Sequence, residues 1–129
     1  MKLHHAMFLA LAFASATAVA AEPDKQAPAE VTLTEAKTWM ALFDKVVDTV
    51  VVNREDCGKM AGGINTLVDE NQPTIAMARD ARAKGKRLPQ SVMQQMADGA
   101  RRMVAALDKC GRDQKVGAAF ARIDLGSRK

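Results

Sequence analysis

Apolar residues recur at steps of three or four along most of this chain, which is the spacing of one face of an α-helix. In the first such segment, Thr32-Leu33-Thr34-Glu35 fits a capping box, in which the Thr32 hydroxyl and the Glu35 carboxylate satisfy free backbone N–H groups. We expect a helix to begin here and to end before Asn53, which can cap the next helix. Its apolar face comprises Ala36, Trp39, Met40, Phe43, Val46, Val47, Val50 and Val51.

The second apolar segment, residues 57–81, is interrupted by Pro73 without a shift of phase. A proline inside a helix removes a hydrogen-bond donor and clashes with the preceding turn, so we expect a kink or a restart, with Asn71 or Gln72 as the cap. Gly85 predicts the end of the segment, because glycine readily takes the left-handed terminal conformation. The apolar face comprises Met60, Ala61, Ile64, Leu67, Val68, Ile75, Ala78 and Ala81.

Two features of these segments admit two interpretations each. Gly62-Gly63 lies inside the second segment, where each glycine costs roughly 1 kcal/mol relative to alanine. The pair indicates close helix packing or local looseness, and a hinge or the approach of a ligand is the alternative. Trp39 and Phe43, one turn apart, are expected to anchor the core, and a self-association face is the alternative.

Pro89 opens a third apolar segment, and Gly111 ends it. The turn at residues 86–88 is so short that we expect the second and third segments to be antiparallel neighbours. Cys57 and Cys110 then reach similar heights on the two apolar faces, which predicts a disulfide that stabilises the fold by about 4 kcal/mol. Two buried free thiols are the alternative. The apolar face comprises Val92, Met93, Met96, Ala100, Met103, Val104, Leu107 and Cys110.

A last short helix follows, with Asp113 as its cap. The predicted fold class is therefore all-α, a small up-and-down bundle of four or five helices closed by one disulfide. We expect residues 32–125 to form this helical domain, after a flexible leader at 21–31 and before a disordered tail at 126–129. The apolar face of the last helix comprises Val116, Ala119, Phe120 and Ile123.

The N-terminal region predicts export. Residues 1–5 are weakly basic, and the apolar run at 6–20 is shorter than a comfortable membrane span. Small residues at 18–21 fit a cleavage site, so we expect residues 1–20 to be a secretory signal peptide and the protein to be periplasmic or secreted. A membrane anchor is the alternative. No later segment is apolar enough to span a membrane, and no cysteine follows the cleavage region to support a bacterial lipid anchor.

Histidine occurs only at positions 4 and 5, so the processed chain would contain none. Without histidine there is no Ser-His-Asp or Cys-His arrangement, no histidine-based zinc site and no haem attachment motif. Neighbouring carboxylates such as Asp69-Glu70 do not face one another on a helix, and no phosphate loop or nucleophile motif occurs. We therefore expect no enzyme activity, no catalytic residue, no metal site and no cofactor.

Acidic and basic residues divide unevenly along the chain. Residues 22–70 contain ten acids and five bases, whereas residues 71–129 contain five acids and thirteen bases. The densest basic run predicts a patch for an acidic protein or for an anionic envelope component, such as lipid head groups or cell-wall polymer. Ordinary solubility charges at a helix end are the alternative, and nucleic acid is not expected because no aromatic residues interleave with the bases. The patch comprises Arg79, Arg82, Lys84, Lys86 and Arg87.

The methionines that remain after processing offer a second functional interpretation. Most lie on the apolar faces, which indicates core packing. The alternative is a pliable apolar surface for client peptides, as in a periplasmic holdase-type chaperone. These residues are Met40, Met60, Met77, Met93, Met96 and Met103.

Three spacings carry a resemblance over residues 53–123. They are Asn53-x-x-Asp56-Cys57-x-x-Met60, then Gly85-Lys86-x-Leu88-Pro89, then Lys109-Cys110. In these the chain resembles uncharacterised small exported two-cysteine helical proteins of bacteria, a resemblance that implies no activity and no site. In size and cysteine spacing alone it is also similar to acid-stress chaperones of the periplasm, without a matching motif. The leading interpretation is a non-catalytic exported binding or structural module, and the holdase is the alternative.

Overall fold

The computed structural model describes residues 29–123. Within this range the chain forms five α-helices, as the hydrophobic periodicity predicts. The all-α fold class is confirmed, and one disulfide joins Cys57 to Cys110. The signal peptide predicted at 1–20, most of the leader and the tail at 126–129 lie outside the described residues. The helices are α2 (Leu33–Val52), α3 (Cys57–Glu70), α4 (Gln72–Ala83), α5 (Gln90–Ala106) and α6 (Gln114–Ala121).

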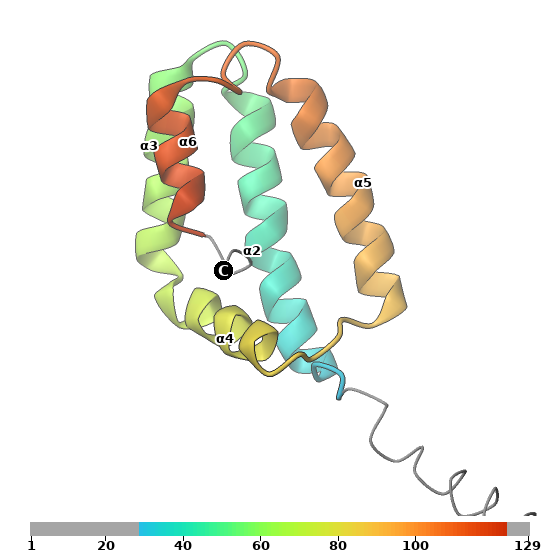
Figure 1. Ribbon diagram of the computed structural model, residues 1–129. Helices are drawn as coiled ribbons and strands as arrows, with labels where there is room; N and C mark the ends of the chain where they lie inside the picture. Colours follow the sequence, from blue (N-terminus) through green and yellow to red (C-terminus); the bar gives the residue numbers. More distant parts are fainter. Residues whose placement is uncertain (1–28, 124–129) are drawn as a thin grey trace, which may run out of the picture.

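Helix α2 is the central element of the bundle (Figure 1). It packs against α5 on one side and against α3 on the other, while α4 crosses one end of the bundle and α6 lies along α3. The expectation that the third apolar segment pairs with the second is therefore wrong, because the neighbour of α5 is α2. Within residues 29–123 the backbone of α5 approaches neither α3 nor α4 closely.

The break around Pro73 explains this arrangement. Helix α3 ends at Glu70 and α4 begins at Gln72, so the chain turns across the end of α2 and delivers α5 to the far side. Asn71 and Gln72 do not cap α4 with their side chains. The Asn71 side-chain amide donates to the Leu67 carbonyl (2.8 Å), and that of Gln72 donates to the Val68 carbonyl (2.9 Å). Both amides thus satisfy the last carbonyls of α3, which have no partner within the helix.

Two of the three other predicted N-caps agree with the structure. Thr32 and Glu35 form the predicted capping box. Asp113 caps α6, as predicted, by accepting from two backbone N–H groups. Asn53 does not cap α3, because it closes α2 instead, and Asp56 accepts the Lys59 N–H (3.0 Å). An aspartate three positions before that N–H has the short side chain and the charge that an N-cap favours.

Gly85 ends α4 in the predicted way, with a φ of 71°. Its N–H donates to the Arg82 carbonyl (3.0 Å), and the Lys86 N–H donates to the Ala81 carbonyl (2.9 Å), which is the bond pattern of a Schellman motif. The end of α5 differs from expectation. The helix ends at Ala106, and residues 107–112 form successive turns before α6, so Cys110 lies in a turn and not on a helix face.

The main core cluster brings together side chains of α2, α3, α4 and α6, with Ala106 of α5, and a smaller cluster of Ala36, Met40 and Val92 joins α2 to α5. Leu42 is also buried, although it lies outside the face predicted for α2. Because α2 contacts neighbours on several sides, its apolar surface is wider than one stripe. The largest fully buried side chains are Met60, Ile64, Ile75, Val47, Val50, Val68, Val116 and Cys110.

The disulfide joins the start of a helix to a turn at one end of the bundle. Cys57 is the first residue of α3, and Cys110 lies in the turn that connects α5 to α6, with the two Cα atoms 5.3 Å apart. The pairing was predicted correctly, but the bridge does not cross a seam between two neighbouring helices. It fixes the α5–α6 connection to the start of α3 instead.

The paired glycines of α3 are expected to respond in opposite ways to alanine. A Cβ at Gly63 would lie 2.7 Å from the Thr49 Cγ2 atom of α2, whereas a Cβ at Gly62 would meet no atom within 4 Å. Gly62→Ala should raise the free energy of unfolding by about 1 kcal/mol through helix propensity, and Gly63→Ala should lower it by about 1 kcal/mol through overpacking. Urea denaturation of both variants tests this, and equal stabilisation by the two would contradict close packing at Gly63.

Candidate anion-binding site

The predicted basic patch lies at the end of the bundle opposite the disulfide (Figure 1). Arg79 and Arg82 belong to the second half of α4, and the other three cations follow in the turn around Gly85. The segment before α2 holds this turn in place. The Arg87 N–H donates to the Ala29 carbonyl (2.9 Å), and the Val31 N–H donates to the Arg87 carbonyl (2.9 Å). These two bonds form an isolated parallel bridge between residues 30 and 87.

The cations of the patch are not equivalent. Lys84 forms an ion pair with Asp80 (3.1 Å), in which both side chains are 60% exposed. Arg79 donates to the carbonyl of Arg122 (2.9 Å) and has a further interaction. Among residues 29–123, no carboxylate pairs with Arg82, Lys86 or Arg87. Arg82 lies in the last turn of α4, and Lys86 and Arg87 lie in the turn that follows the helix. These three residues are named the turn cations below, and they are the part of the predicted patch that is available to a ligand.

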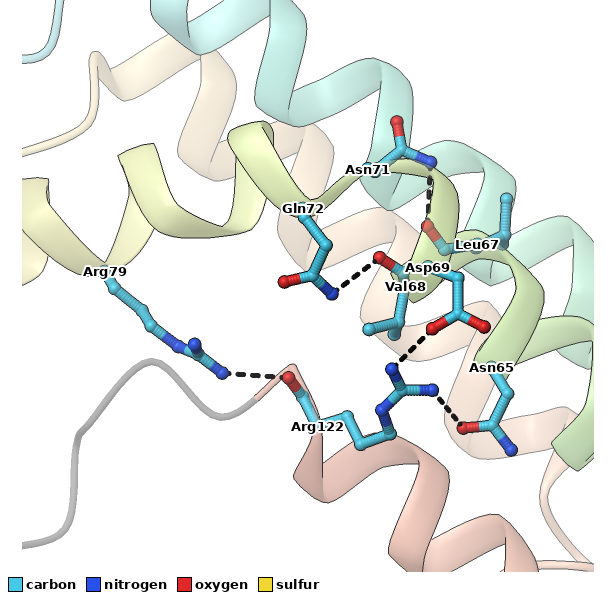
Figure 2. A network of polar contacts seen from close by, with 8 residues as sticks. All are labelled: Asn65, Leu67, Val68, Asp69, Asn71, Gln72, Arg79 and Arg122. Carbon is cyan, nitrogen blue, oxygen red and sulfur yellow. Dashed lines mark hydrogen bonds and ion pairs between the residues drawn. The ribbon is translucent and has the colours of Figure 1, made fainter.

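Arg79 belongs to a network that fixes the end of α6 (Figure 2). The Arg122 guanidinium donates to Asn65 Oδ1 (2.9 Å) and to Asp69 Oδ1 (2.6 Å), both on α3. Its backbone carbonyl accepts from Arg79 of α4. Arg122 therefore connects three helices, and the guanidinium of Arg79 has a structural role that the charge pattern alone does not reveal.

A surface cavity of about 400 Å³ lies beside the turn cations. It occupies the crossing of α2 and α4, and the segments that precede α2 and follow α4 complete it. Most of its lining is apolar, and its charged residues are Arg82, Lys86 and Glu35. The apolar part of the lining comprises Val31, Trp39, Met77, Ala78, Ala81, Gly85 and Leu88.

The sequence patterns did not predict this cavity. Its walls come from residues up to 57 positions apart, between 31 and 88, and they meet only because α4 turns across α2 after Pro73. The periodic pattern places Trp39, Ala78 and Ala81 on apolar faces, which is correct, but it does not give the angle between the helices. The only local signal is the half-buried Leu88, an apolar residue inside a basic turn.

Glu35 is the one carboxylate of the cavity lining, and it already has a partner. Its Oε1 atom accepts the Thr32 N–H (3.1 Å) within the capping box. The lining therefore carries two cations and one carboxylate that is engaged by the backbone. This balance favours an anion over a cation in the cavity.

The described residues contain no other candidate site of comparable definition. No cluster of three or more His, Cys, Asp or Glu side chains suited to a metal occurs in residues 29–123, and no polar side chain is buried there. None of the helices in that range has the length and hydropathy needed to cross a bilayer. Comparisons of the chain with family models, with curated proteins and with solved structures gave no match.

Proposed function

We propose that this protein is a non-catalytic, exported binding module whose turn cations, Arg82, Lys86 and Arg87, bind an anionic envelope component or an acidic protein. The observation that carries the proposal is their lack of ion pairs within residues 29–123. They lie at the end of α4 and in the turn after it, where the N–H and the carbonyl of Arg87 are both hydrogen-bonded to the segment before α2. A ligand anion then gains new charge-assisted contacts without breaking existing ones.

Two features of the turn support this role. The left-handed Gly85 and the bridge to residues 29–31 fix the backbone, so little backbone conformational entropy is lost when an anion binds. Arg82 lies in the last turn of α4, and Lys86 and Arg87 follow the helix, so all three are near its C-terminus, where positive charge is favoured by the helix dipole. The disulfide supports the exported location, since such bonds persist in oxidising compartments.

Neutralisation of the turn cations tests the proposal. Combined Arg82→Gln, Lys86→Gln and Arg87→Gln should weaken binding to vesicles that contain an anionic phospholipid by roughly 100-fold, because each cation near such a surface contributes about 1 kcal/mol. The measurement is vesicle co-sedimentation at low and high salt, with polyglutamate as a soluble acidic polymer in parallel. Affinity for at least one of these probes should fall as salt rises.

The matched control removes the same charge at the opposite end of the bundle. Lys109, Arg112 and Lys115 are exposed residues near the disulfide, and their replacement by glutamine changes the net charge equally. This control should retain most of the binding. Equal losses in the two triple variants would show that only net charge matters, and binding that is indifferent to salt would rule out the proposed patch.

The holdase alternative has one specific observation in its favour. Met93 and Val104 on α5 are 54% and 70% exposed, so part of that helix presents apolar surface to solvent. Against it, Met40 and Met60 are buried, and Met77, Met96 and Met103 pack against the core, as the core interpretation expects. A holdase should suppress aggregation of unrelated unfolded proteins regardless of salt, which the binding module should not do.

A further inference from the structure

The cavity between α2 and α4 lies next to the turn cations, and two of these, Arg82 and Lys86, are part of its lining. We infer that it takes the apolar chain of a small anionic amphiphile, whose carboxylate or phosphate lies at Arg82 and Lys86. The inference rests on the proposed function, because the same turn binds the anion. It adds the chemical class of the ligand, one short apolar chain with a negatively charged head.

The lining of the cavity favours an apolar chain. Trp39 contributes from α2, Met77 and Ala81 contribute from α4, and Leu88 closes the cavity from the turn. Met77, Ala81 and Leu88 remain partly exposed in the unliganded protein. An apolar group in the cavity would remove their surface from water, which is the main favourable term in the binding of such groups.

The size of the cavity limits the chain. Ligand sites are commonly about 300–1,000 Å³, and 400 Å³ lies near the lower end of that range. At about 30 Å³ for each non-hydrogen atom, the share of a water molecule in the liquid, the cavity accommodates about a dozen such atoms. A single chain of the size of decanoate fits this volume, whereas a phospholipid with two long chains does not.

The charges of the lining select the head group. Arg82 and Lys86 supply donors and positive charge, and Arg87 adds to the field from the same turn. Glu35 is the opposing charge, and its Oε1 atom is already engaged by the Thr32 N–H (3.1 Å). An anionic head should therefore be preferred over a neutral or a cationic one.

Trp39 provides the measurement, because it is the only tryptophan of the chain and it lines the cavity. Titration of the full disulfide-bonded protein with decanoate, below its micelle concentration, should change the tryptophan fluorescence in a saturable way. Decyl phosphate should do the same, and the stronger of the two identifies the preferred head group. Decanol should bind about tenfold more weakly, and decyltrimethylammonium more weakly still.

Two sets of variants separate the chain from the head group. Combined Arg82→Gln and Lys86→Gln should weaken decanoate or decyl phosphate binding about tenfold, while the control Lys109→Gln and Lys115→Gln should leave it unchanged. Ala81→Leu should fill the cavity and abolish binding of the chain while retaining vesicle binding. Ala78→Leu serves the same purpose if circular dichroism shows that Ala81→Leu is not folded.

The outcomes distinguish this inference from the proposed function. Absence of saturable binding by both anions, equal binding of decanol, or insensitivity to both cavity-filling variants would overturn the inference. Salt-dependent vesicle or polyglutamate binding in the same protein would then leave the proposed function intact. Conversely, amphiphile binding that depends on Arg82 and Lys86, without vesicle or polyglutamate binding, would support the cavity site and refute an extended anionic partner.

Discussion

Simultaneous replacement of Cys57 and Cys110 by alanine is expected to lower the free energy of unfolding by about 4 kcal/mol. The two cysteines are 53 positions apart, so the bond closes a long loop, and its main effect is to restrict the unfolded chain. Such a loss is a large fraction of the 5–15 kcal/mol that is usual for a domain. The described part of the chain, residues 29–123, is also short enough for one cross-link to matter.

Urea denaturation with and without reductant measures this effect. The wild-type protein should lose stability when the bond is reduced, and the double alanine variant should be indifferent to reductant. Because the bond lies at the opposite end of the bundle from the turn cations, any variant that remains folded should retain the affinity for anionic vesicles that we propose. A reductant effect below 1 kcal/mol would show that the loop closure contributes little.

Ile64→Ala is expected to lower the free energy of unfolding by about 2–5 kcal/mol. Ile64 lies in the middle of α3 with none of its surface exposed, inside the main core cluster. Truncation removes its buried methyl and methylene groups and leaves a cavity that the neighbouring helices can close only in part.

The matched control is Val104→Ala, an apolar truncation on α5 at a position that is 70% exposed. It should change the free energy of unfolding by no more than about 0.5 kcal/mol. Both variants are compared with the wild type by urea denaturation of the oxidised protein. Similar effects at the two positions would contradict the arrangement of the core around α2, α3 and α6.

Most of the helices could be predicted because their signals are local. The capping box at Thr32, the Asp113 cap and the end of α4 at Gly85 each depend on residues a few positions apart. The cysteine pairing was also predicted, but the reason offered for it, a hairpin of neighbouring helices, was wrong. The angle at the Pro73 break decides which helix α5 meets, and hydrophobic periodicity carries no information about that angle.

For the candidate site, the sequence predicted the position of the basic patch but not the role of each cation or the cavity beside it. A run of basic residues is visible in the sequence, so the patch could be located by inspection. The structural role of Arg79 could not be predicted, because this residue donates to the carbonyl of Arg122, 43 positions away in the sequence. The cavity depends on the crossing of α2 and α4 and was missed for the same reason.

Helix α5 packs against a single helix of the described chain, which affects how it can open locally. Its only close helix neighbour in the described chain is α2, and Gly99 sits against the Phe43 ring where the two meet. The chain is held just before this helix by the bond to residues 29–31 and just after it by the disulfide. Opening of α5 would therefore break its packing on α2 and remove Met96, Met103 and Ala106 from the main core, while both of its ends stay tethered; amide exchange along α5 would measure how often this occurs.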